Sequence, residues 1–176
     1  MAIELQDYNK NKCAENGGVS EIYLYQLCDR ESFTLSPEGV VTGITLKSGT
    51  TAVRWTPDIE SSVFTDDGAR QRENNSYMVS QTGMIMLKDD DDSTRESVED
   101  ASRGFLGVIV KKANPAGVNQ FIHFGFVNGM VAETTNGTTG QNFEDMRGHT
   151  VNFMGKELGL APTVDASVIP TIYTAS

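Results

Sequence analysis

The chain has 176 residues, of which 38% are hydrophobic and 22% are charged, and its formal net charge is −10. A chain of this length can bury a core without the help of disulfide bonds or bound metal ions, and we expect one domain. An acidic surface repels the nucleic-acid backbone, which disfavours a protein that reads DNA sequence, although acidity also serves solubility alone. No apolar run approaches membrane-spanning length, so we expect no membrane partner.

Short strands are predicted in the first third of the chain, after a polar arm over residues 1–18 that we expect to be flexible. Strands are expected where β-branched and aromatic residues gather or alternate, at residues 19–27, 31–35, 40–46 and 50–56. The sequence Ser36-Pro-Glu-Gly39 has proline and glycine where a tight turn needs them. Trp55 falls at a position that suits burial in its strand.

A long charged segment follows, from Asp58 to Asn75. Loops of this length in compact domains are usually functional or disordered, so we predict either a mobile surface loop or a segment that orders on a neighbouring subunit. An apolar pair in its middle would suit a protruding hairpin arm. Mixed charges suit pairing with a second copy, the alternative being an ordinary solvated turn. The candidate inter-subunit contacts are Val63, Phe64, Asp66, Asp67, Arg70 and Arg72.

Residues 76–87 alternate, which predicts one long strand, or two strands with a bulge at Thr82-Gly83. A short helix is then predicted near 93–103, beginning at Ser93, with Glu96 in the capping-box position. The run Asp89–Asp92 either caps this helix or forms a weak Ca²⁺ or Mg²⁺ site. Its spacing lacks the alternation of an EF-hand loop, so we favour the cap and predict no metal.

The centre of the fold is predicted between Gly104 and Glu157. Two apolar runs, 104–110 and 118–126, flank a turn signal at 113–117 and predict a hairpin. A polar Thr/Asn/Gly loop to Gly140 and a last alternating run, 149–153, follow. Residues 166–176 are predicted as a C-terminal tail or edge strand. We therefore expect a single mainly β domain over 19–165, two packed antiparallel sheets in a sandwich or barrel, with one short helix.

Catalytic and metal-binding patterns are absent from the sequence. There is no nucleophile elbow, no phosphate-binding loop and no zinc signature. A Ser-His-Asp arrangement would have to use His123 or His149, and strand histidines are more often structural. Cys13 and Cys28 fit no zinc spacing, and we favour two free thiols while pairing stays open. With no signal peptide, the chain is expected to be made as a cytosolic protein without enzymatic activity or cofactor.

Several segments resemble one known family. They are Phe121–Gly129, Gly140–Phe153, Gly155–Glu157 with Ala161-Pro162, and an opening with Cys13, Gly17–Val19 and Ile22–Leu24. These are similar to tail-tube-like proteins of tailed bacteriophages, in particular those of phages that infect Bacteroidetes. His149 stands where that family more usually has an aromatic residue. The shared motifs carry no catalytic residue.

The resemblance implies a structural virion protein of the phage tail, assembled in the host cytoplasm. It implies homo-oligomeric rings, usually hexameric, that stack into a tube through which DNA passes. In that family the N-terminal arm and the loop that corresponds to 58–75 bridge rings. A connector or ring protein of a short tail is a variant of the same interpretation. The alternative is a carbohydrate-binding or adhesion sandwich, which would need exposed aromatic residues on a sheet face.

Overall fold

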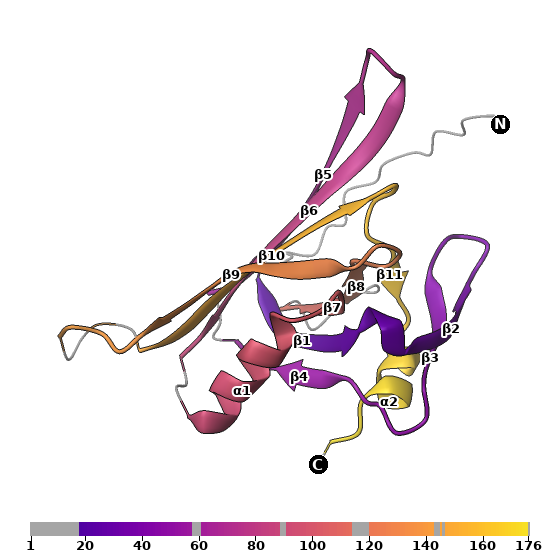
Figure 1. Ribbon diagram of the computed structural model, residues 1–176. Coiled ribbons are helices and arrows are strands. Elements are labelled where there is room, and N and C mark those ends of the chain that lie inside the picture. Colours follow the sequence, from indigo (N-terminus) through magenta and orange to yellow (C-terminus); the bar gives the residue numbers. More distant parts are fainter. Residues whose placement is uncertain are drawn as a thin grey trace, which may run out of the picture.

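The fold consists of strands and a few short helices in the part of the chain that the structure describes. This computed structural model describes residues 18–57, 61–88, 91–113, 120–142, 145 and 147–175. The strands are β1 (Val19–Gln26), β2 (Arg30–Leu35), β3 (Val41–Leu46), β4 (Val53–Trp55), β5 (Val63–Gln71), β6 (Ser76–Leu87), β7 (Leu106–Lys112), β8 (Phe121–Phe124), β9 (Met130–Thr138), β10 (Gly148–Glu157) and β11 (Thr163–Val164). The helices are α1 (Asp92–Ala101), α2 (Ile169–Ile172) and 3-10 turns at Leu27–Asp29 and Ala166–Val168. The predicted mainly β fold is confirmed (Figure 1).

Some predictions lie outside the described residues. These are the N-terminal arm before Gly18 with Cys13, the carboxylates Asp89 and Asp90, and most of the turn predicted at 113–117. The hairpin that this turn was expected to close is present, because β7 pairs with β8 from Val108↔Phe124 to Lys111↔Phe121.

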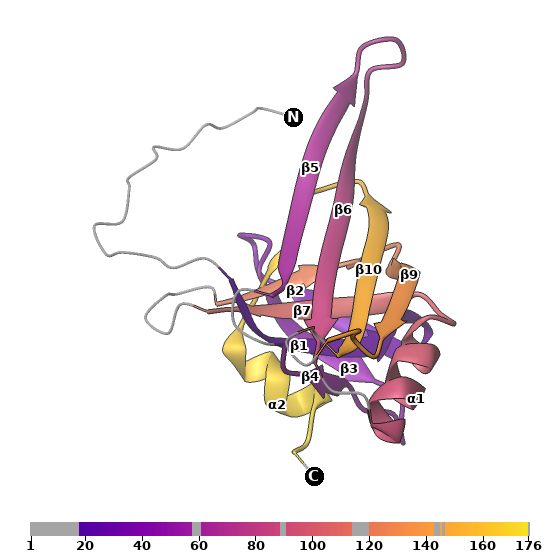
Figure 2. The same cartoon turned by 90° about the vertical axis from the view of Figure 1, so that its left-hand side faces the viewer.

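The strands form two layers joined at one corner. Four strands, in the order β9-β10-β6-β5, form what we call the front sheet, and the other seven, β2-β3-β11-β8-β7-β1-β4, form the back sheet. Among the described residues, a single bridge between Leu106 of β7 and Met130 of β9 connects the two sheets. Figure 2 shows the front sheet with β5 and β9 at its two margins.

Apolar residues of both sheets form the main core between them. Ile22, Trp55 and Phe153 belong to this core, and the predicted burial of Trp55 is confirmed, since it is 6% exposed. A second cluster lies on the opposite face of the back sheet, where α2 packs against Tyr23 and Ile109. Because alternate residues of a strand face opposite sides, Ile22 and Tyr23 enter different clusters.

The prediction of a long loop over 58–75 was wrong. Residues 63–71 are strand β5, which pairs with β6 in unbroken antiparallel register from Val63↔Met84 to Gln71↔Ser76. The ribbon extends as a protruding hairpin, as the alternative arm interpretation expected (Figure 1). Hydrogen bonds to β6 pair one side of the β5 backbone, so a charged edge strand can form with few apolar side chains. The same register leaves β6 without the bulge considered at Thr82-Gly83.

Two further segments differ from prediction. The polar stretch expected as a loop to Gly140 is mostly strand β9, which continues to Thr138 in pairing with β10. The C-terminal segment is helical between Ala166 and Ile172, not an edge strand or a loose tail. Its buried side chains, Val168, Ile169 and Ile172, anchor it in the second cluster.

Helix α1 begins earlier than predicted. Its N-cap is Asp91, whose carboxylate accepts a hydrogen bond from the Thr94 N–H at 2.7 Å and from the Ser93 hydroxyl at 3.1 Å. Ser93 therefore lies inside the helix, and Glu96 is not at the capping-box position. These hydrogen bonds lower the pKa of the Asp91 carboxyl, the expected result for an N-cap carboxylate.

The chain passes from the back sheet to the front sheet through a tight bend, Gly125–Gly129. Its two terminal glycines have positive φ, 63° and 84°. A Cβ on Gly125 would lie 2.6 Å from the Met130 amide nitrogen and 2.8 Å from the Leu106 carbonyl oxygen. Since both obstacles are backbone atoms, only glycine fits here without displacing the junction of the two sheets.

Front-sheet side chains supply hydrogen bonds to the backbone of this bend. The amide oxygen of Gln81 accepts from the Gly125 N–H at 2.7 Å. One carboxylate oxygen of Glu157 accepts from the N–H groups of Val127 at 3.0 Å and Asn128 at 2.8 Å. Gln81 and Glu157 are only 1% and 3% exposed. Buried irregular backbone is costly unless it is paired, so these two side chains permit the bend.

Arg30 binds the bend from the back sheet. It donates to the carbonyl oxygen of Phe126. Its guanidinium carbon lies 4.8 Å from the ring centroid of Phe33 and 4.9 Å from that of Phe126. Cation–π contact and the hydrogen bond together hold strand β2 against the bend.

Candidate assembly surfaces

The front sheet ends in two strands that have an unpaired margin. Within the described residues, β5 pairs with β6 only, and beyond Met130 strand β9 pairs with β10 only. Each strand has nine residues. Unpaired N–H and C=O groups along such a margin form a ready template for another strand.

The outer face of the front sheet is polar but carries few charges. Its side chains alternate with the buried ones along each strand, and they include Val63, Thr65, Asp67, Ser80, Thr82, Met84, Met86, Val131, Glu133, Thr134, Thr150, Asn152, Met154 and Lys156. Cross-strand hydrogen bonds link the Thr65 and Thr82 hydroxyls at 2.8 Å and the Asn152 amide to Thr134 at 2.7 Å. A shallow hollow of about 250 Å³ opens over this face. The acidity of the chain is therefore not concentrated here.

The six residues predicted as inter-subunit contacts do not form one surface. Phe64 packs into the core, with its ring centroid 5.2 Å from that of Phe124. The Asp66 carboxylate accepts from the Ala161 N–H at 2.9 Å, which ties the loop after β10 to β5. Both side chains are half-buried and are engaged in contacts within the chain.

The other four candidates are exposed along the β5–β6 hairpin. Val63 is 52% exposed at the base of the hairpin, and Asp67 lies farther along β5. Arg70 and Arg72 lie near the tip, where Arg70 donates to the Asn75 side-chain oxygen. These four side chains remain candidates for contact with another copy.

Sequence reasoning missed an exposed apolar shelf beside the base of the hairpin. The shelf consists of Phe33, Leu35, Val127, Leu158 and Leu160, which are between 43% and 74% exposed. Four of these, all but Phe33, line a hollow of about 270 Å³. The sequence Leu158-Gly-Leu160 directly after a strand was the available signal. Apolar side chains gathered in this way indicate a protein-binding surface.

A second surface missed by sequence reasoning is a groove between β4 and α1. These two elements lie at the end of the molecule away from the hairpin tip (Figure 1). Its two halves, of about 550 and 400 Å³, share Val53, Trp55 and Ser97 as lining residues. Val53 is 49% exposed, and the Trp55 indole N–H donates to the Ser97 hydroxyl at 3.0 Å. Asp29, Asp100 and Arg103 line one half, and Arg54 and Lys88 line the other.

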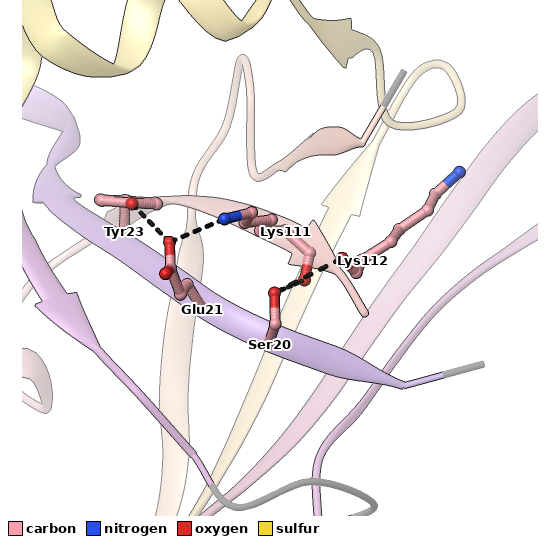
Figure 3. A network of polar contacts seen from close by, with 5 residues as sticks. All are labelled: Ser20, Glu21, Tyr23, Lys111 and Lys112. Carbon is pink, nitrogen blue, oxygen red and sulfur yellow. Dashed lines mark hydrogen bonds and ion pairs between the residues drawn. The ribbon is translucent and has the colours of Figure 1, made fainter. Parts of the chain in front are cut away.

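A polar network ties β1 to the end of β7 (Figure 3). The Glu21 carboxylate accepts from the Tyr23 hydroxyl at 2.7 Å and from the Lys111 ammonium at 3.4 Å. Burial and the bond to Glu21 raise the pKa of Tyr23 to about 12. Burial would raise the pKa of Glu21, but Tyr23 and Lys111 outweigh it and lower that pKa. The network fixes strand pairing and brings together no nucleophile and base.

His123 is a fully buried side chain and not a catalytic candidate on this geometry. Its Nδ1 lies 3.0 Å from the Phe124 carbonyl oxygen, which requires a proton on Nδ1, so Nε2 accepts from the Tyr25 hydroxyl at 2.7 Å. Burial and the nearby Arg30 charge lower the pKa of His123 to about 3. His149 lies on β10, away from this contact.

Other candidate sites are absent from the described residues. No group of three or more His, Cys, Asp or Glu side chains there could hold a metal ion. Cys28 is an exposed free thiol. Within the same residues, no helix is long and apolar enough to span a membrane. Trp55, the chain's one tryptophan, is buried and offers no platform for a sugar.

Comparisons of the chain with protein-family models, curated proteins and solved structures gave no match.

Proposed function

We propose that this protein is a structural virion protein whose copies assemble into rings, and that the rings stack into a phage tail tube that conducts DNA. The proposed partners are further copies of the chain in a hexameric ring and other tail or connector proteins. A ring of a short tail would use the same contacts. The resemblance in sequence motivates this proposal, and one structural observation carries it.

That observation is the pair of unpaired margins on a four-stranded antiparallel sheet. Neighbouring strands alternate in direction across β9, β10, β6 and β5, so β5 runs opposite to β9. Rotating a second copy about an axis beside the sheet would place its β9 against β5 of the first copy in antiparallel orientation. The alternation then continues from copy to copy, and a fixed rotation closes the ring.

The chemistry of the outer face supports a conduit. Phosphate binding needs clustered lysine and arginine, and Lys156 is the only basic side chain among the outer-face residues named above. Hydroxyl, amide and thioether groups would give a continuous wall that neither attracts nor strongly repels DNA. This differs from a strongly acidic wall, which the net charge alone would suggest.

Assembly is the test of this proposal. Negative-stain microscopy and native mass spectrometry of the full chain, over a range of concentrations, should show closed rings of one stoichiometry. Pairs of cysteines introduced at Thr65 and Thr134, one on each margin, should cross-link between copies. A strict monomer at high concentration would overturn the proposal.

A further inference from the structure

The apolar shelf is held in place by the rest of the chain. Leu158 and Leu160 lie on the loop that follows β10 and are 74% and 60% exposed. The loop begins directly after Glu157, which is 3% exposed, and at its other end the Ala161 N–H donates to the Asp66 carboxylate at 2.9 Å. The two leucines are therefore exposed on an anchored surface, which is typical of a protein-binding site.

The hollow in the shelf combines apolar walls with a carboxylate. It lies where the turn between β2 and β3 meets the loop after β10 (Figure 1). Its walls are formed by Leu35, Phe126, Val127, Leu158, Leu160 and Pro162, and Glu157 is the one charged residue among the described residues that line it. Sites for free small ligands usually measure roughly 300–1,000 Å³. The volume of this hollow, about 270 Å³, suits a single long side chain of a partner better.

Glu157 uses only one of its carboxylate oxygens to hold the bend. The N–H groups of Val127 and Asn128 both donate to Oε1, at 3.0 and 2.8 Å. Among the described residues, no hydrogen bond ends on Oε2, and Glu157 forms no ion pair. A carboxylate that is almost fully buried has lost most of its hydration, so a cation placed at Oε2 would form a strong charge-assisted hydrogen bond.

Arg30 does not supply that cation. Its guanidinium donates to the Phe126 carbonyl oxygen, and its guanidinium carbon lies 4.8 and 4.9 Å from the ring centroids of Phe33 and Phe126. Arg30 is also absent from the residues that line the hollow. The negative charge of Glu157 is therefore available to a group that enters from outside.

We infer that the shelf binds a segment of another protein that carries an arginine or lysine flanked by apolar side chains. The hydrocarbon part of the basic side chain would lie against the leucines of the hollow, and its charged end would bind Oε2 of Glu157. The flanking apolar side chains would cover Phe33 and the exposed parts of Leu160. The inference goes beyond the proposed function, because this surface is complete in a single copy.

Charge favours a different, basic protein over a second copy as the occupant. A two-fold contact of shelf on shelf would bring two Glu157 carboxylates together in an apolar interface, where like charges are costly. Glu38 is exposed next to Gly39, one of the lining residues, and adds negative charge at the rim. The chain as a whole has a net charge of −10, which attracts basic partners.

Selection from a random heptapeptide library on the immobilised full-length protein tests this inference. Peptides with an arginine or lysine between apolar residues should be enriched, and calorimetry then measures the affinity of the best one. Glu157→Gln keeps an acceptor for the bend but removes the charge. It should weaken binding about thirtyfold, which corresponds to roughly 2 kcal/mol for a buried charge pair. A selection without basic peptides, or equal binding to Glu157→Gln, would overturn the inference.

Filling the hollow tests the same site without changing Glu157. Gly159 lines the hollow, its φ lies outside the left-handed region, and a Cβ there meets nothing within 4 Å. Gly159→Trp should therefore fold normally, as urea denaturation would verify, and abolish peptide binding. The control is Ser48→Trp, at an exposed turn residue outside the shelf, which should bind the peptide like the wild type. Normal binding by Gly159→Trp would show that the hollow is not the site.

Microscopy of the wild-type chain separates this inference from the proposed function. Closed rings that do not bind the basic peptide would overturn this inference alone. A strict monomer that binds the peptide through Glu157 would overturn the proposed function and support this inference.

Discussion

Replacing Gly125 with alanine tests whether the close backbone approach at the bend constrains the fold. The new Cβ would lie 2.6 Å and 2.8 Å from backbone atoms of Met130 and Leu106, the two residues that bridge the sheets. A positive φ costs an L-residue roughly 1–2 kcal/mol. Displacing packed backbone adds roughly 1–3 kcal/mol. We therefore expect a loss of about 2–5 kcal/mol in the free energy of unfolding.

The matched control is Gly39→Ala. Gly39 has a φ of 80°, but a Cβ there meets nothing within 4 Å, so this variant reports the conformational cost alone, roughly 1–2 kcal/mol. Urea denaturation followed by circular dichroism gives both values. If the two variants lose the same stability, the close approach at the bend does not constrain the fold, and the reasoning is refuted.

Three further perturbations test other parts of the structure. Because folding lowers the pKa of His123 from 6.5 to about 3, the unfolded chain binds more protons between these values, and stability should fall as pH drops through that window. Between pH 6.5 and 5 the loss should approach roughly 2 kcal/mol in urea titrations, and a flat profile would contradict it. Glu157→Ala should cost roughly 2–4 kcal/mol because it leaves two bend N–H groups unpaired, whereas Glu157→Gln keeps an acceptor oxygen and should cost less than half as much in the same titrations. Replacing Ala69–Met78 with an Asn-Gly turn should preserve the melting temperature and the rings but abolish stacks in micrographs; normal stacks would show that the tip is dispensable.

The sequence predicted the parts of the fold in which apolar residues repeat along the strand. The alternation in β6 and the apolar runs of β7 and β8 gave correct strands, because those strands bury one or both faces. The burial of Trp55 followed from the same reasoning.

Strands β5 and β9 could not be predicted in this way. Their outer halves are exposed on both faces, so they lack the alternation that marks a half-buried strand. Their strand conformation depends on backbone pairing with the strand that follows each of them, β6 for β5 and β10 for β9. The helix at Ile169–Ile172 was missed because a short apolar run suits a strand or a helix equally, although Pro170 in its first turn was a signal for a helix.

The candidate surfaces were the least predictable part. The predicted contact set combined core and surface residues, since Phe64 and Asp66 are used within the chain. The groove brings β4 next to α1, and no local pattern in either segment indicates a shared cavity. Such a surface depends on how the two sheets are joined.

The polar side chains around the bend determine how the sheets are joined. The buried His123, Gln81 and Glu157 and the half-buried Arg30 all bind backbone atoms of one segment, Phe124–Asn128. An apolar core alone would tolerate a shift of two residues along a strand, because the same face stays buried. A shifted strand would leave buried polar groups without partners, at a cost of roughly 1–3 kcal/mol each.

This network therefore fixes the front sheet in one position relative to the back sheet. The two unpaired margins belong to the front sheet, while the groove belongs to the layer that carries β4 and α1. In a closed ring, any variation in the relative placement of the margins and the groove would recur in every copy and accumulate around the ring. A protein that needed only to be stable could replace these polar groups with apolar ones; a protein that must present the same margins in every copy requires a single arrangement.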